Sequence, residues 1–271
     1  MRLYTIVLSA LTLLIVSCEN MQQDIELELP EYENKLVVES YLERGKPFRV
    51  TLTESQAYFD QPGNPVIQDA LVIITYGENT DTLEFNPSFL DLNTLKVYNF
   101  VSENTVPEDF DGPYTLYVKD NSGREAVAET SFIEELNLDT IRLQYNSENE
   151  VLLLISFTDP PVVANYYRLI VNKDSLTAAP DVSFQLSDGS LDGEQITLGT
   201  GYDYEIGDTV FVTLFHLSEK YFRFLATSSS AQSAQGNPFG QPGAVETNIE
   251  GGLGIFVALT YDRRKLIIPA K

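Results

Sequence analysis

From Leu36 onward, apolar and polar residues alternate in short runs, and turn residues separate one run from the next. Alternation with a period of two is typical of half-buried β-strands. Residues 36–43 and 48–53 therefore predict a hairpin, with Gly45 in its turn. In the second strand the spacing puts Phe48, Val50 and Leu52 on one face and Arg49, Thr51 and Thr53 on the other.

The same pattern predicts further strands along the chain: 71–76, 81–85, 114–119, 124–132, 151–157, 166–172, 182–186, 194–198 and 209–216. Residues 253–260 and 265–268 predict a closing hairpin, with the basic cluster Arg263-Arg264-Lys265 at its turn. Strands that recur about every ten residues are typical of sandwiches. The predicted fold class is mainly β, with two antiparallel β-sandwich domains of immunoglobulin or fibronectin type, residues 36–135 and 136–271, joined near 133–139.

One segment breaks the β pattern and predicts a short helix near 218–232. Ser218 can cap its N-terminus, and Glu219 suits the positive end of the helix dipole. Tyr221, Phe222, Leu225 and Ala226 recur at helical spacing.

The N-terminus has the pattern of an export signal. Arg2 precedes an apolar run, residues 3–16, that is too short to span a bilayer. The run ends in Ile15-Val16-Ser17-Cys18, which resembles the bacterial lipobox, and Cys18 is the only cysteine of the chain. We expect residues 1–17 to be a lipoprotein signal peptide and Cys18 to carry diacylglycerol and fatty acids such as palmitate. The alternative is a general secretory signal with an incidental buried thiol.

Residues 18–35 are polar and acidic and are expected to form a tether between the lipid and the folded body. Acidic residues directly after a lipidated cysteine resemble the signal that exports Bacteroidota lipoproteins to the cell surface.

Composition excludes one class of partner. The chain has 271 residues, 40 Asp and Glu against 17 Lys and Arg, and a net charge of −23. Affinity for nucleic acid comes from basic side chains that displace counterions, so nucleic acid is not an expected partner. Fifteen Phe and fifteen Tyr are far too many for a disordered acidic chain, which indicates a globular protein.

Catalytic motifs are not evident. His216 is the only histidine, and the chain contains no Gly-x-Ser-x-Gly motif, so a Ser-His-Asp hydrolase is not expected. We expect His216 to be a hydrogen-bonded residue at the junction of strand and helix. Paired carboxylates could hydrolyse glycosides, but 40 acidic residues make some close pairs inevitable. No catalytic or cofactor-binding residue is predicted.

Two loops could hold calcium. Residues 108–112 and 188–194 concentrate Asp, Glu and Gly, and hard cations prefer oxygen ligands. Neither loop has the spacing of an EF-hand, and Asp and Gly are also ordinary turn residues. The prediction is no metal site, with calcium as the alternative.

The segment from Gly236 to Gly252 is long for a connection inside a compact domain. Two prolines, Pro238 and Pro242, stiffen it, and Phe239 stands alone among polar and small residues. We expect Pro238, Phe239, Pro242 and Asn248 to form a partner contact if the protein has one. The alternative is that Phe239 is buried and fixes a crossover from the helix to the last strands.

The motifs Asn237-Pro238-Phe239, Gln241-Pro242 and 248–256 (Asn-Ile-Glu-Gly-Gly-Leu-Gly-Ile-Phe), together with the lipobox, resemble the Bacteroidota lipoproteins of domain-of-unknown-function family 4249. The resemblance implies an outer-membrane lipoprotein encoded near TonB-dependent receptors, and it brings no catalytic residues. The expected function is therefore that of a non-enzymatic outer-membrane or surface lipoprotein, an accessory or ligand-capturing partner of a TonB-dependent receptor. A structural or adhesive surface lipoprotein and a carboxylate-based carbohydrate-active enzyme are the alternatives.

Overall fold

The computed structural model describes residues 32–57, 65–91, 96–189, 191–234 and 243–271. The chain divides into two units, Met1–Glu33 and Asn34–Lys271, and the fold below is that of the second. In the described residues no helix has the length and apolar character needed to cross a membrane.

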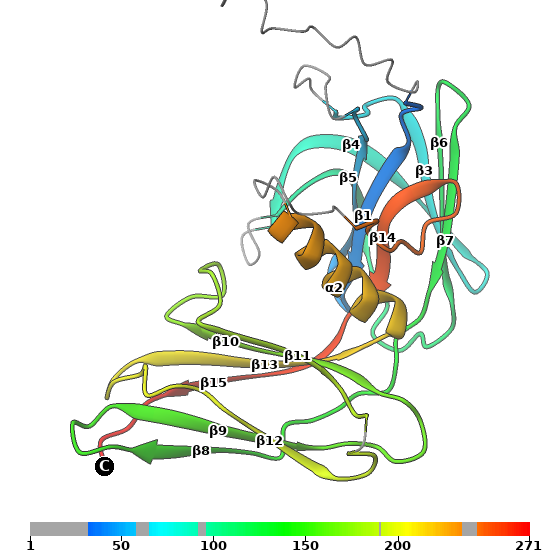
Figure 1. Cartoon of the computed structure of the whole chain (residues 1–271). Helices are drawn as coiled ribbons and strands as arrows, with labels where there is room; N and C mark the ends of the chain where they lie inside the picture. Colours follow the sequence, from blue (N-terminus) through cyan, green and yellow to red (C-terminus); the bar gives the residue numbers. More distant parts are fainter. Residues whose placement is uncertain (1–31, 58–64, 92–95, 190, 235–242) are drawn as a thin grey trace, which may run out of the picture. The chain divides into compact units, whose positions relative to one another are not determined.

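The described chain is mainly β with one helix, which confirms the mainly β part of the predicted fold class (Figure 1). The strands form one eight-stranded, one four-stranded and one three-stranded sheet. Their bounds are β1 (Leu36–Leu42), β2 (Pro47–Glu54), β3 (Ala70–Tyr76), β4 (Asn79–Asp91), β5 (Lys96–Thr105), β6 (Tyr114–Asp120), β7 (Glu125–Thr130), β8 (Thr140–Tyr145), β9 (Val151–Thr158), β10 (Tyr166–Lys173), β11 (Val182–Ser187), β12 (Gln195–Gly199), β13 (Thr209–Leu217), β14 (Gly252–Ala258) and β15 (Thr260–Ile267).

The eight-stranded sheet has the order β14-β1-β2-β5-β4-β3-β6-β7. The predicted hairpin β1–β2 is confirmed. The predicted strands 71–76 and 81–85, and 114–119 and 124–132, also pair as hairpins, β3–β4 and β6–β7. The two ends of the sheet meet, because Val127 and Glu250 exchange backbone hydrogen bonds of 2.9 and 2.8 Å. One sheet thus curls into a nearly closed, barrel-like arrangement around its own core, where two facing sheets were expected.

The four-stranded sheet, β11-β10-β13-β15, and the three-stranded sheet, β12-β9-β8, share a second core. It is formed by the alternate, inward-facing residues of the central strands, among them Leu153, Ile155, Leu169, Val171 and Val212. The five strands predicted between residues 151 and 216 are confirmed as β9 to β13. Two strands, β5 and β8, were not expected.

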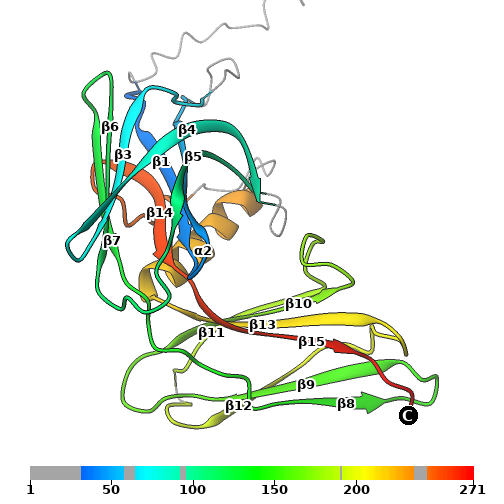
Figure 2. The ribbon, with the colours of Figure 1, turned by 180° about the vertical axis from the view of Figure 1, so that it is seen from behind.

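The predicted helix is α2 (Glu219–Ala234). Ser218 caps it, since its hydroxyl accepts a hydrogen bond of 3.3 Å from the Tyr221 amide. The helix lies beside β1 and β14, as Figures 1 and 2 show from opposite sides. Tyr221 joins a third apolar cluster with Tyr41, Tyr98, Ile255 and Val257, so α2 covers part of the outer face of the eight-stranded sheet.

The predicted closing hairpin is wrong. β14 runs parallel to β1, whereas β15 pairs antiparallel with β13, so the two strands enter different sheets with only Leu259 between them. Arg263-Arg264-Lys265 therefore lies within β15, not in a turn. β14, expected in the domain 136–271, belongs to the sheet built by residues 36–130.

Candidate functional site

The outer face of the four-stranded sheet carries an unusual set of side chains. Inward positions of β10, β13 and β15 fill the second core, and outward positions alternate with them. Register places Arg168, Phe215 and Tyr261 in one row across the sheet, and Ile170, Thr213 and Arg263 in the next. A third row ends in Lys265. We call the outward positions of these three strands the basic face.

The basic face contains no Asp or Glu, and every one of its positions lies in the described part of the chain. It has Arg168, Arg263 and Lys265 as its charged residues. Acidic residues outnumber basic ones 40 to 17 in the whole chain. The face is therefore a local reversal of the protein's overall charge.

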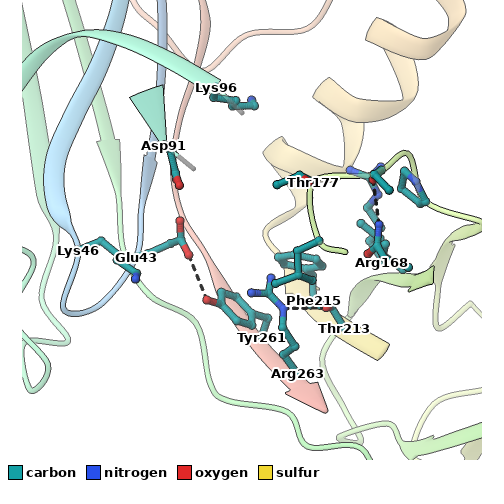
Figure 3. Close-up of a pocket in the computed structure, with 15 residues that line it drawn as sticks. Glu43, Lys46, Asp91, Lys96, Arg168, Thr177, Thr213, Phe215, Tyr261 and Arg263 are labelled. Atoms are coloured by element: carbon teal, nitrogen blue, oxygen red, sulfur yellow. Dashed lines mark hydrogen bonds between the residues drawn. The ribbon is translucent and has the colours of Figure 1, made fainter. Parts of the chain in front are cut away.

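The basic face forms one wall of a cavity of about 460 Å³, shown in Figure 3. This volume is within the range of small-molecule sites. We call the cavity the Arg168 pocket. Its lining consists of basic, acidic, hydroxyl and apolar side chains, namely Lys46, Lys96, Arg168, Arg263, Glu43, Asp91, Asn172, Thr177, Thr213, Tyr261, Ile170, Leu176, Ala178, Pro180 and Phe215.

The opposite wall is organised by Arg49, which is only 3% exposed. Its guanidinium binds the carboxylates of Glu43 and Asp91 and lies 4.8 Å from the ring centre of Tyr98. Two carboxylates line the pocket, and both bond this one arginine. A buried guanidinium without carboxylate partners would strongly destabilise the fold. Arg49, Glu43 and Asp91 therefore form a structural unit.

Tyr261 connects the two walls. Its hydroxyl donates a hydrogen bond of 3.0 Å to Glu43, as drawn in Figure 3. Its ring also lies under the guanidinium of Arg263, 4.7 Å from the ring centre. The position of Glu43 is thereby tied to the basic face.

Lys96, from the start of β5, contributes an ammonium group to the pocket. It lies 3.6 Å from Glu39 and 3.9 Å from the ring centre of Tyr41. Burial lowers the pKa of Lys96, Glu39 opposes that shift, and the positive charges of Arg49 and Arg168 add to it. Lys96 is thus close enough to both arginines to be repelled by them.

Arg168 and Arg263 have unused donors. Nε of Arg263 donates to the Thr213 hydroxyl at 2.9 Å, and Nε of Arg168 donates to the Ser183 hydroxyl at 3.3 Å. Within the described residues, neither arginine forms an ion pair with a carboxylate, and their Nη atoms have no hydrogen-bond partner. The arrangement can bind a ligand, with two guanidinium groups that are anchored at one nitrogen and open at the other two.

The structure places His216 away from this pocket. Its Nδ1 lies 2.9 Å from the carbonyl oxygen of Glu134 and its Nε2 lies 3.0 Å from Oδ1 of Asn165. The ring also stacks on Tyr167. The predicted role of His216, a hydrogen-bonded residue at the junction of strand and helix, is confirmed.

Three carboxylates of the two candidate calcium loops, those of Asp111, Asp188 and Asp192, have protein partners. Asp111 forms an ion pair of 2.6 Å with Arg44. Asp188 accepts backbone hydrogen bonds from Asn165 and Gly189, and Asp192 accepts one from Val162. Within the described ranges, no three His, Cys, Asp or Glu side chains gather as a metal site would require.

The residues expected to contact a partner are not brought to this pocket. Cys18, Pro238, Phe239 and Pro242 lie outside the described residues. Asn248 is described, and both ends of its side-chain amide bond the backbone of Phe256, at 2.6 and 2.9 Å. This side chain fixes residue 248 to β14.

Sequence reasoning missed the residues of the Arg168 pocket. Arg168 and Arg263 come from strands that are far apart in the chain, and one was assigned to a turn. A usable signal was the absence of acidic residues at alternate positions of three strands in a strongly acidic chain.

Comparison with known proteins identifies the family of this chain. No curated protein matches significantly. Among solved structures, a chain described as "Cytokine receptor complex - Crystal form 1A" aligns over 88% of this chain and 98% of its own, at 10% identity and a TM-score of 0.26. That likeness is too weak to carry an argument. The family described as "Domain of unknown function (DUF4249)" matches residues 22–265, and the chain belongs to this family.

Proposed function

We propose that this protein is a non-enzymatic lipoprotein of the outer membrane or cell surface that captures a small ligand in the Arg168 pocket. In this proposal it is an accessory subunit that passes the ligand to a TonB-dependent receptor. The observation that carries the proposal is the pocket itself, whose basic wall has open hydrogen-bond donors and whose carboxylates are already bound.

A binding role fits the chemistry of the pocket better than a catalytic one. Carboxylate catalysis needs one group free to donate a proton and another free to attack or to activate water. Glu43 and Asp91 both bond Arg49, which gives each a structural task. The pocket lining includes neither histidine nor cysteine.

The proposed location rests on the sequence and on the family resemblance. A lipid on Cys18 would hold the protein at a membrane, because each buried methylene contributes about 0.8 kcal/mol and several acyl chains act together. The receptor partner is what the resemblance implies for proteins of this family. The acidic residues 18–35 would separate the pocket from the lipid.

Fractionation of cells that express the full chain tests the location. We expect wild-type protein in the outer membrane, with acyl groups on Cys18 detected by mass spectrometry, and Cys18→Ala in soluble fractions. An unmodified Cys18 thiol in the mature protein would overturn the lipoprotein assignment.

Crosslinking and co-purification from the native host test the partner. We expect a TonB-dependent receptor to be recovered with wild-type protein, and less of it with Phe239→Ala at unchanged thermal stability. Recovery of the protein without any receptor would favour a structural or adhesive role. Turnover of glycans by the purified protein would favour an enzyme.

A further inference from the structure

We propose that the Arg168 pocket is an oxyanion site, which binds the carboxylate or phosphate group of a partly apolar small molecule between Arg168 and Arg263. This inference rests on the proposed function for its biological role, and it adds the chemical class of the ligand.

The register of the sheet sets the spacing of the two guanidinium groups. Arg168 pairs with Phe215 and Arg263 pairs with Thr213, so the arginines lie on the two strands that flank β13, two residues out of register. Two strand spacings correspond to about 10 Å, and two residues along a strand to about 7 Å. Long side chains from these positions can reach toward a group held above β13.

Both arginines are partly ordered before any ligand binds. Hydrogen bonds from Nε to Thr213 and Ser183 restrict each side chain and leave Nη1 and Nη2 open. A guanidinium presents these donors as a planar fork that matches the two oxygens of a carboxylate or phosphate. Because part of the side-chain entropy is already lost, less is lost on binding.

The charges around the pocket favour an anion. The basic face lacks acidic residues, and Arg49 balances one of the two negative charges of Glu43 and Asp91. Lys46 lines the same cavity and forms no ion pair among the described residues. The chain as a whole has a net charge of −23, so the charge of this face differs in sign from that of the protein.

The apolar part of the lining specifies the rest of the ligand. Phe215 lies on β13, between the strands of the two arginines, and Ile170 lies beside Arg168 on β10. Leu176 lines the cavity from the β10–β11 loop. A free inorganic anion would leave these side chains uncovered. An oxyanion attached to an aromatic or aliphatic body would bury them and gain affinity from that contact.

Three probes that share a phenyl ring test the charge requirement: benzoate, phenyl phosphate and benzamide, the neutral isostere of benzoate. Saturation-transfer NMR titrations of the purified full chain should show benzoate, phenyl phosphate or both binding, and benzamide binding at least about tenfold more weakly. The ratio of the two anions separates a carboxylate site from a phosphate site. Added salt should weaken the binding of the anions and leave that of benzamide unchanged.

Variants locate the site. Arg168→Gln and Arg263→Gln should each weaken binding of the preferred anion about tenfold or more. Arg168→Lys, which keeps the charge without the fork, should give an intermediate loss. Arg142→Gln is the matched control, because Arg142 is an exposed arginine on β8 that forms no ion pair among the described residues. Melting curves of all variants check that they are folded.

Benzamide bound as tightly as benzoate, no binding by either anion, or anion binding unchanged in both Arg→Gln variants would overturn the inference. None of these results would overturn ligand capture by a lipoprotein, since fractionation and receptor co-purification do not depend on the probes. Conversely, the protein could bind benzoate through Arg168 but be found in soluble fractions and without a receptor. That result would support the oxyanion site and contradict the proposed function.

Discussion

Nε2 of His216 lies 3.0 Å from Oδ1 of Asn165. On the other side of the ring, Nδ1 lies 2.9 Å from the carbonyl of Glu134, in the segment that links β7 to β8. The only histidine of the chain thus ties that linking segment to the start of β10. This geometry gives His216 a structural task.

Replacing His216 tests that task. His216→Phe retains an aromatic ring beside Tyr167 and removes the two ring nitrogens that face the oxygens of Glu134 and Asn165, so hydrogen bonding at this junction is lost. We expect a loss of about 1 to 3 kcal/mol in the free energy of unfolding, measured in urea. His216→Gln, whose amide can restore one bond, should lose less. Equal stability of His216→Phe and wild type would contradict this role.

Replacing Arg49 should destabilise the protein more than replacing His216. Arg49→Met would leave the carboxylates of Glu43 and Asp91 without the charge that balances them. Removing one partner of a buried ion pair typically costs about 3 to 5 kcal/mol. Denaturant unfolding should show a loss of this size, whereas Arg142→Met on the exposed edge of β8 should change stability by less than about 0.5 kcal/mol. Similar small losses for both variants would show that the buried cluster is dispensable.

Gly254 allows β14 to approach β1. Its φ is +107°, and a Cβ at this position would lie 2.0 Å from the carbonyl oxygen of Val38. Backbone strain alone costs about 1 to 3 kcal/mol, and the clash adds to it. We therefore expect Gly254→Ala to lower the melting temperature well below that of Gly123→Ala. Gly123 also has positive φ, +86°, but has open space around it. Equal losses of melting temperature in the two variants would contradict the need for a close approach of β14 to β1.

The ionisation of Asp120 is expected to make the stability of the folded protein depend on pH. Burial alone would raise the pKa of this carboxyl, but hydrogen bonds from Ser122 and Arg124 outweigh it and hold the pKa below its ordinary value of 3.8. A lowered pKa in the folded state stabilises the protein above that value, and the contribution is lost as pH falls. The melting-temperature difference between wild type and Asp120→Asn should be full at neutral pH and should shrink below about pH 3.8.

The exposed Asp109 gives the matched control for that experiment. Asp109→Asn should differ little from wild type at any of these pH values. If the melting-temperature difference between wild type and Asp120→Asn stayed constant down to pH 2, ionised Asp120 would not be the source of the stabilisation.

Local structure was largely predictable from the sequence, because alternation and turn residues act over a few positions. Phe48, Val50 and Leu52 are buried as their spacing indicates. Strand pairing was less predictable. The hairpin expected near the C-terminus was wrong because β14 pairs with β1, and no local signal distinguishes a hairpin from two strands that enter different sheets.

The candidate site was not predictable for the same reason. The spacing placed Arg49 with Thr51 and Thr53 on the face opposite the apolar residues of its strand, and gave no sign that it would be buried. The structure buries its guanidinium against the ring of Tyr98 and the carboxylate of Glu43, which also accepts a hydrogen bond from Tyr261. In the sequence, Arg168 and Arg263 are ordinary polar residues of alternating strands. Only the order of the strands in the sheet shows that they share one surface.

The parallel pairing of β1 with β14 also has a consequence for biogenesis. Leu36 is synthesised well before its neighbour Gly252, because strands β2 to β13 and the helix lie between them in the chain. The first sheet therefore lacks one of its strands until residues 252–258 have been synthesised. Truncation before residue 252 should leave β1 as an exposed edge open to aggregation, and a peptide spanning Gly252–Ala258, added in trans, should suppress it.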